Sequence, residues 1–236
     1  MTLIVLGTCP ESFQNWLSDV SISKLDLPYP GAKDAAIHSG FWHAYNNTAL
    51  RPGIHSALKD EFLGGQSMFS KPRLVVTGHS LGGAMAYLAA LDLQKSFDIS
   101  KSEIRVVTVG SPRVGNQMFA KFFSRMIPQS TRLVNNLDIV PTMPPMREGF
   151  YHAPNEVWLY DSSIGPVHQD VEYPIVWMNT EFSNKTDDCR SDWCGLFVDR
   201  CISIFDHLFV MGINLGWKTV KSCKEISKSN LSQLQD

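Results

Sequence analysis

The sequence predicts an α/β fold, with a mostly parallel central sheet and helices on both of its faces. Short apolar, β-branched runs alternate along the chain with longer amphipathic or alanine-rich segments, which is typical of consecutive β–α–β units. The chain also lacks internal repeats, low-complexity segments and recognisable linkers. Residues 1–236 are therefore expected to form a single domain.

The individual elements follow from this alternation. Residues 12–20 predict a short amphipathic helix, because Phe13, Trp16, Leu17 and Val20 recur at spacings of three and four. Residues 25–33 predict a loop, since two prolines and a glycine interrupt them. Strands are expected at residues 2–6, 73–77, 104–109, 131–137 and 157–160. Further helices are expected at residues 41–62, with an irregularity near Pro52-Gly53, at 81–97, at 116–126, and from 201 to an end near 212–216.

Composition excludes several classes of function. The formal net charge of −2 argues against a nucleic-acid partner, which a basic surface would attract. The most apolar stretch, residues 202–217, carries Asp206 and His207, so no transmembrane segment is expected. The five cysteines and nearby histidines match no common zinc spacing, so neither a metal nor another cofactor is expected.

The pattern G-x-S-x-G at residues 78–82 is the feature that indicates chemistry. A β-branched strand leads into it and an alanine-rich helix follows, which is the strand–turn–helix context of a nucleophile elbow. Such a turn holds its serine, here Ser80, in a strained conformation, and Gly78 and Gly82 leave room for it. Leu81 is the first residue of the expected helix, and its N–H is expected to stabilise an oxyanion.

A serine nucleophile needs a base, usually histidine, oriented by a carboxylate. In the α/β-hydrolase order the acid follows the serine and the histidine comes last. Asp138 fits the acid because it follows the predicted strand 131–137, and Asp161 is its rival. For the base, His207 is favoured over His152, because an ionisable pair with Asp206 in so apolar a segment needs a functional reason.

Several motifs resemble those of the fungal-type class 3 triacylglycerol lipase family. The matching segments are GT at 7–8, NWLSD at 15–19, HSGF at 38–41, GHSLGG at 78–83, GSPRVGN at 110–116, NLDIVP at 136–141 and DH at 206–207. The resemblance implies an α/β-hydrolase fold, with Ser80 as nucleophile, Asp138 as orienting acid and His207 as base. It also implies an oxyanion hole formed by Thr8 and Leu81, and a structural role for His152.

The chain departs from the family pattern at its start. Leu6 stands where the family usually has an arginine before the Gly-Thr pair. The family also has a helix and strands before this point, so the resemblance implies that the first strands and any signal peptide are missing from this chain. No signal peptide is recognisable at residues 1–7, and the full-length form is expected to be secreted.

The resemblance also suggests the substrate. The apolar face of residues 12–20 is interpreted as a lid that opens at a lipid–water interface over an acyl site. This favours a lipase that cleaves acylglycerols through an acyl-enzyme. Two alternatives stay open: a feruloyl-type or other esterase that acts on soluble esters, and a catalytically inert, lipase-like binding protein.

Overall fold

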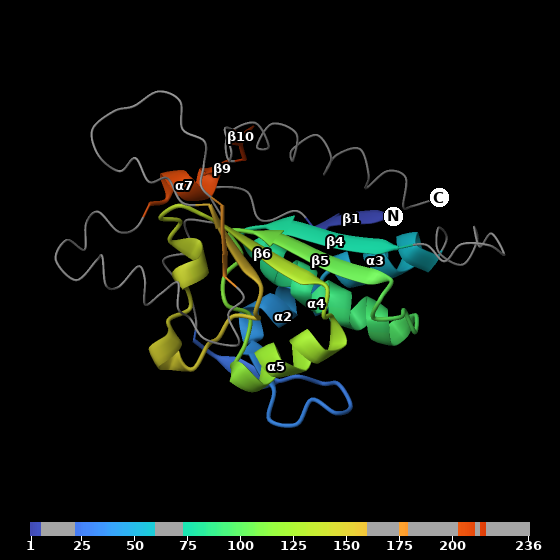
Figure 1. Ribbon diagram of the computed structural model, residues 1–236. Helices are drawn as coiled ribbons and strands as arrows, with labels where there is room; N and C mark the ends of the chain where they lie inside the picture. Colours follow the sequence, from blue (N-terminus) through green and yellow to red (C-terminus); the bar gives the residue numbers. More distant parts are fainter. Residues whose placement is uncertain (6–21, 60–72, 160–174, 179–202, 211–212, 216–236) are drawn as a thin grey trace, which may run out of the picture.

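The computed structural model describes residues 1–5, 22–59, 73–159, 175–178, 203–210 and 213–215 (Figure 1). Its centre is a six-stranded sheet of order β1-β4-β5-β6-β7-β8. The strands are β1 (Thr2–Val5), β4 (Leu74–His79), β5 (Ile104–Val109), β6 (Ser130–Asn135), β7 (Glu156–Leu159) and β8 (Ile175–Met178). Neighbouring strands pair in parallel from β1 to β7, and β8 joins β7 antiparallel. The prediction of an α/β fold with a mostly parallel sheet is confirmed.

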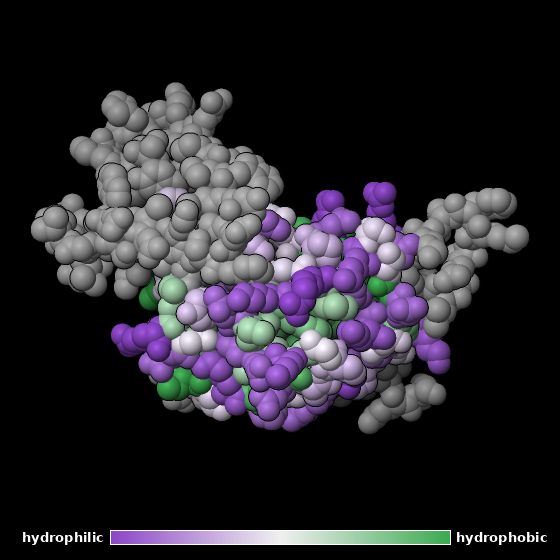
Figure 2. Space-filling model, turned by 60° about the horizontal axis from the view of Figure 1, so that its bottom comes forward, coloured by the Kyte–Doolittle hydropathy of each residue, from purple (hydrophilic) through white to green (hydrophobic). Residues whose placement is uncertain are grey.

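The crossover helices lie together on one face of the sheet. They are α2 (Ser39–Asn46), α3 (Leu50–Leu58), α4 (Leu81–Ser96) and α5 (Gln117–Met126). Because each crossover moves one strand further in the same direction, right-handed connections place them on the same side. Figure 1 shows α2, α4 and α5 below the sheet, and Figure 2 shows that the lower face is mostly hydrophilic, as expected for a surface in contact with water.

Helix α4 is the central helix of this layer. It packs against the sheet on one side and against α2 on the other, so nearly all of its residues are buried, among them Leu88 and Leu91. The sheet contributes the alternate residues of each strand to the same core, such as Val76 of β4 and Val106 of β5. This double burial explains why the segment after Ser80 is rich in alanine and leucine instead of amphipathic.

Two predicted elements in the first part of the chain were wrong in detail. The expected loop at 25–33 begins inside a short antiparallel pair, β2 (Lys24–Asp26) with β3 (Ala36–His38). The long helix expected at 41–62 is broken at residues 47–49, earlier than Pro52-Gly53. Pro52 lies in the first turn of α3, where the missing N–H has no intrahelical partner to lose, so the helix accommodates it.

The C-terminal helix was also predicted incorrectly. Among residues 203–210 and 213–215, which the structure describes there, α7 (Phe205–Leu208) is the one helix, and it leads into an antiparallel pair of β9 (Phe209–Val210) and β10 (Ile213–Asn214). The side-chain amide of Asn135 binds the carbonyl oxygens of Asp206 and Phe209, at 2.9 and 2.8 Å, and thereby fixes this short turn against the sheet. Strand β8 was not predicted at all. Within the described residues, every helix is too short or too polar to cross a bilayer.

Candidate active site

Ser80 occupies a sharp turn between β4 and α4. Its backbone angles are φ 59° and ψ −132°, and residues other than glycine rarely adopt such a positive φ. A Cβ atom on Gly78 would collide with the carbonyl group of Gly82 and lie 2.8 Å from the nitrogen of Gly83, so this turn requires glycine at position 78. The Ser80 hydroxyl is buried and has no hydrogen-bond partner among the described residues. The local geometry is that of a nucleophile elbow.

Asp138 lies in the loop that leaves β6 at the same edge of the sheet. Its side chain is fully buried, and its Oδ1 accepts a hydrogen bond of 2.9 Å from the N–H of Val140. Its Oδ2 lies 2.8 Å from Nδ1 of His207. The structure therefore brings the predicted acid and the predicted base together from positions 69 residues apart.

The Asp138–His207 contact defines how the imidazole is oriented. Because a carboxylate only accepts hydrogen bonds, Nδ1 of His207 carries the proton and donates it to Asp138. This leaves Nε2 as the basic nitrogen of the neutral ring. His207 itself is completely buried within α7.

The residue next to His207 secures this segment to the acid loop. Asp206 Oδ2 accepts hydrogen bonds of 3.2 Å from the side chain of Asn136 and from the N–H of Leu137. The prediction that Asp206 and His207 are a buried pair was therefore only partly correct: His207 is buried, whereas Asp206 is half-buried and contacts the loop.

Gly110, which follows β5, makes a further contribution that the sequence did not reveal. It has φ +56°, and a Cβ atom there would lie 2.6 Å from Asp138 Oδ2 and 2.9 Å from His207 Nδ1. The Asp138–His207 pair therefore packs directly against this backbone. Gly110 opens the GSPRVGN segment, whose pattern marked it as unusual without indicating this contact.

The two remaining histidines near the site have different surroundings. His152 is buried, and its Nε2 donates to the carbonyl oxygen of Pro141 at 2.7 Å, so it holds the loop that follows Asp138. His79, immediately before Ser80, stacks on His207 with ring centroids 4.4 Å apart. Burial and the neighbouring His207 lower the pKa of His79 to about 4.

Other predicted site residues lie outside the described part of the chain. They are Thr8 of the expected oxyanion hole, the expected lid residues Phe13, Trp16, Leu17 and Val20, and the rival acid Asp161; the five cysteines, for which no metal site was expected, lie outside it as well. Among the residues that the structure does describe, none of the His, Cys, Asp and Glu side chains form a group that would hold a metal ion.

The described site residues all converge on the carboxyl edge of the parallel strands. Ser80 follows β4, Gly110 follows β5, Asp138 follows β6, and α7 brings His207 beside that edge (Figure 1). A serine at an elbow with a carboxylate–histidine pair at the same edge defines the site of an α/β-hydrolase.

Comparison with known proteins identifies the family. The model of the family described as Lipase (class 3) matches residues 2–148, and the chain belongs to this family. A lipase from Rhizomucor miehei is 33% identical over 217 residues, which cover 91% of this chain and 53% of that protein. The secreted mono- and diacylglycerol lipase 1 of Fusarium solani is 28% identical, with 91% of this chain and 60% of that protein covered.

Solved structures give the same result. The Rhizomucor miehei triacylglyceride lipase superposes with a TM-score of 0.71 at 30% identity, covering 91% of this chain and 73% of that one. A second structure, described as a triacylglycerol lipase whose catalytic centre is a serine protease triad, also gives 0.71, at 31% identity with the same coverage. The chain spans about half the length of the curated relatives that it matches first.

Proposed function

We propose that this chain is a serine hydrolase that cleaves the carboxylic ester bonds of acylglycerol lipids. The observation that carries the proposal is the 2.8 Å contact between Asp138 and His207 at the sheet edge where the Ser80 elbow lies. Membership of the class 3 lipase family supports the same activity. In this proposal Ser80 is the nucleophile, His207 the general base and acid, and Asp138 the carboxylate that orients it.

The proposed reaction proceeds in two balanced steps. Nε2 of His207 takes the hydroxyl proton of Ser80 while Oγ attacks the ester carbonyl carbon. The tetrahedral intermediate then expels the alcohol, which takes the proton from His207, and leaves an acyl-enzyme. A water molecule, deprotonated in the same way, attacks the acyl-enzyme and releases the fatty acid, and the proton returns from His207 to Ser80.

The electrostatics of the site suit these steps. Asp138 stabilises the imidazolium that forms on His207 in each half-reaction, because the pair is buried and hydrogen-bonded. The N–H of Leu81, in the first turn of α4, has no acceptor four residues back and is proposed to bind the oxyanion together with Thr8. Loss of one such donor typically lowers turnover ~10²–10³-fold.

The substrate and setting are inferred from the relatives. Those relatives include secreted mono- and diacylglycerol lipases and triacylglycerol lipases, so we propose acylglycerols as the substrate class and secretion of the protein. The apolar side chains of Phe13, Trp16, Leu17 and Val20 are proposed to meet the lipid–water interface.

A covalent probe tests the proposed function. The oxygen of an activated serine attacks the phosphorus of a fluorophosphonate, and fluoride leaves. The intact mass of the chain then increases by one phosphonyl group. We expect labelling of the wild-type chain and of the His43→Ala variant, which alters an exposed histidine of α2. We expect no labelling of Ser80→Ala. Equal labelling of Ser80→Ala and wild type would refute the assignment of the nucleophile.

Substrate class needs a second measurement. Hydrolysis of an emulsified triglyceride and of a soluble p-nitrophenyl ester is compared for wild type and for a Phe13→Ala/Trp16→Ala double variant. We expect the variant to lose more activity on the emulsion than on the soluble ester. Equal losses on both substrates would contradict the proposed interfacial role.

A further inference from the structure

His79 occupies the variable position of the G-x-S-x-G pattern, yet its side chain contacts the proposed base. Its Nε2 lies 2.9 Å from the carbonyl oxygen of His207, a residue 128 positions further along the chain. Since a carbonyl oxygen only accepts, Nε2 of His79 carries the proton and donates it. The same two residues also stack, with an angle of 27° between their rings.

The two contacts hold different parts of His207. The hydrogen bond fixes the backbone of α7, and the stacking restricts the tilt of the imidazole ring. Asp138 restricts the same ring from its Nδ1 edge. His79 is the residue directly before Ser80, so any change in its side chain alters the link between the nucleophile turn and the base.

Helix α7 needs such anchors because it is only four residues long. A single helical turn has little stability of its own. Asn135 and Asp206 attach α7 to the end of β6 and to the acid loop. His79 attaches it to the end of β4, on the side of the nucleophile.

His79 is suited to this position because it remains neutral. Burial lowers its pKa first, and the adjacent His207 lowers it further. A neutral ring can lie against His207 while that residue carries the imidazolium charge, whereas a second cation at 4.4 Å would oppose its formation.

We propose that His79 is a positioning residue of the active site: its Nε2–H bond and its ring stacking hold His207 between Asp138 and Ser80. This inference rests on the proposed function, because it assigns His79 a role through the proposed base. It concerns the geometry of His207 and not a proton transfer by His79 itself.

Three substitutions separate the two contacts. His79→Ala removes both, His79→Phe keeps an aromatic ring without the donor, and His79→Gln keeps an N–H donor without the ring. We expect His79→Ala to lower kcat on a soluble p-nitrophenyl ester about 10–100-fold, with KM changed less than about twofold. His79→Phe and His79→Gln should each recover part of the loss. Rates of the variants that retain His207 are expressed per site titrated with the fluorophosphonate, which removes any contribution from unfolded protein; rates in a His207→Ala background are expressed per mole of folded, soluble protein.

A double-variant comparison tests whether His79 acts through His207. In a His207→Ala background, the further change His79→Ala should leave the residual rate unchanged. Wild-type kcat per titrated site in His79→Ala would overturn the proposal, as would the same fold loss in both backgrounds. His43→Ala serves as the matched control and should retain wild-type turnover.

A measurement that needs no turnover separates this inference from the proposed function. The proton between His207 Nδ1 and Asp138 should give a low-field proton resonance in the NMR spectrum of the wild-type chain. We expect His79→Ala to broaden or shift this resonance, and His43→Ala to leave it in place. An unchanged resonance in His79→Ala would overturn the positioning role. Failure of wild type to hydrolyse esters, with the resonance still sensitive to His79, would overturn only the proposed function.

Discussion

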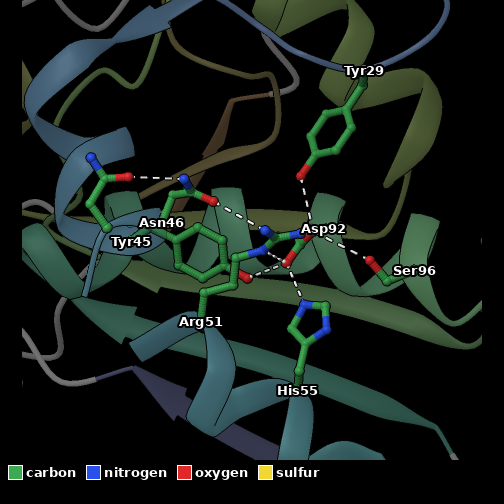
Figure 3. Close-up of polar contacts among 8 residues, drawn as sticks. Tyr29, Tyr45, Asn46, Arg51, His55, Asp92 and Ser96 are labelled. Atoms are coloured by element: carbon green, nitrogen blue, oxygen red, sulfur yellow. Dashed lines mark hydrogen bonds and ion pairs between the residues drawn. The ribbon is translucent and has the colours of Figure 1, made fainter. Parts of the chain in front are cut away.

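Asp92 is expected to be the most consequential single carboxylate for the stability of the helical layer. It lies in the C-terminal half of α4, and its side chain is 2% exposed. Figure 3 shows side chains from α2, α3, α4 and the segment after β2 converging on it; we refer to these residues as the Asp92 hub. The hub consists of Asp92 with Tyr29, Tyr45, Arg51, His55 and Ser96.

The contacts from Arg51, His55 and Tyr45 are short, and together they reach both carboxylate oxygens, whereas those from Tyr29 and Ser96 are longer, at 3.3 and 3.4 Å. Arg51 donates from Nε to Oδ2 and from Nη2 to Oδ1, each at 2.9 Å. His55 lies 2.6 Å and the Tyr45 hydroxyl 2.7 Å from Oδ2. Despite burial, which acts in the opposite direction, these donors lower the pKa of Asp92 from 3.8 to about 2.

The magnitude of an Asp92→Asn substitution follows from these contacts. At ~1.4 kcal/mol per pKa unit, the lowered pKa corresponds to about 2 kcal/mol of stabilisation of the folded state. The asparagine side chain also places an NH₂ group among the donors of the hub. The N–H groups that then lack an acceptor destabilise the folded state by about a further 1–3 kcal/mol. We therefore expect Asp92→Asn to lower the free energy of unfolding by about 3–5 kcal/mol at pH 7.

The pH dependence provides the sharper test. A carboxyl group whose pKa is lowered by folding stabilises the folded state at pH values above its unfolded pKa of 3.8. This stabilisation is lost as the pH falls toward the folded pKa of about 2. Urea unfolding of wild type and Asp92→Asn is measured at pH 7, 5 and 2.5, with Asp26→Asn, at an exposed position, as control. We expect a constant difference between pH 7 and 5 and a difference about 1.5 kcal/mol smaller at pH 2.5, where most but not all of the stabilisation is lost. A difference independent of pH would refute the reasoning.

Three further predictions concern the site and its support. Gly110→Ala should lower turnover at least ~100-fold, because its Cβ would displace the Asp138–His207 pair; wild-type kinetics would contradict the contact. His152→Ala should lower the free energy of unfolding by about 1–3 kcal/mol by leaving the Pro141 carbonyl unpaired, while activity per titrated site persists; an inactive, folded variant would instead favour His152 as the base. Tyr45→Phe should cost about 1 kcal/mol in urea unfolding, and no change in the midpoint would exclude its bond to Asp92.

The parallel strands were the most predictable part of the fold. Strand β5 occupies the predicted residues 104–109, and β4, β6 and β7 begin one residue from their predicted starts. Such strands are buried on at least one face and appear as apolar, β-branched runs bounded by polar residues, so local sequence determines them. Helix α4 was predictable for the same reason, because its alanine-rich segment follows the elbow directly.

The elements that escaped prediction depend on distant contacts. The residues of strand β3 contact residues far along the chain. Ile37 forms an isolated β-bridge with Gly115, and the N–H of Ala36 donates to Oδ1 of Asn116. In the described part of the expected tail helix, α7 is followed at once by β9, and Asn135 binds one carbonyl oxygen of each, those of Asp206 and Phe209. No local pattern encodes either contact.

The candidate site shows the same division between local and distant determinants. The Ser80 turn was recognisable because its strand, glycines and helix are adjacent in sequence, whereas the choice of Asp138 and His207 over Asp161 and His152 also depended on family resemblance. The packing of Gly110 and the stacking of His79 became visible only in three dimensions. Since α7 is a single turn, its position at the sheet edge is determined by its anchors and not by its own helix propensity. Changes at those anchors are therefore expected to impair the proposed chemistry even where Ser80, Asp138 and His207 are all retained.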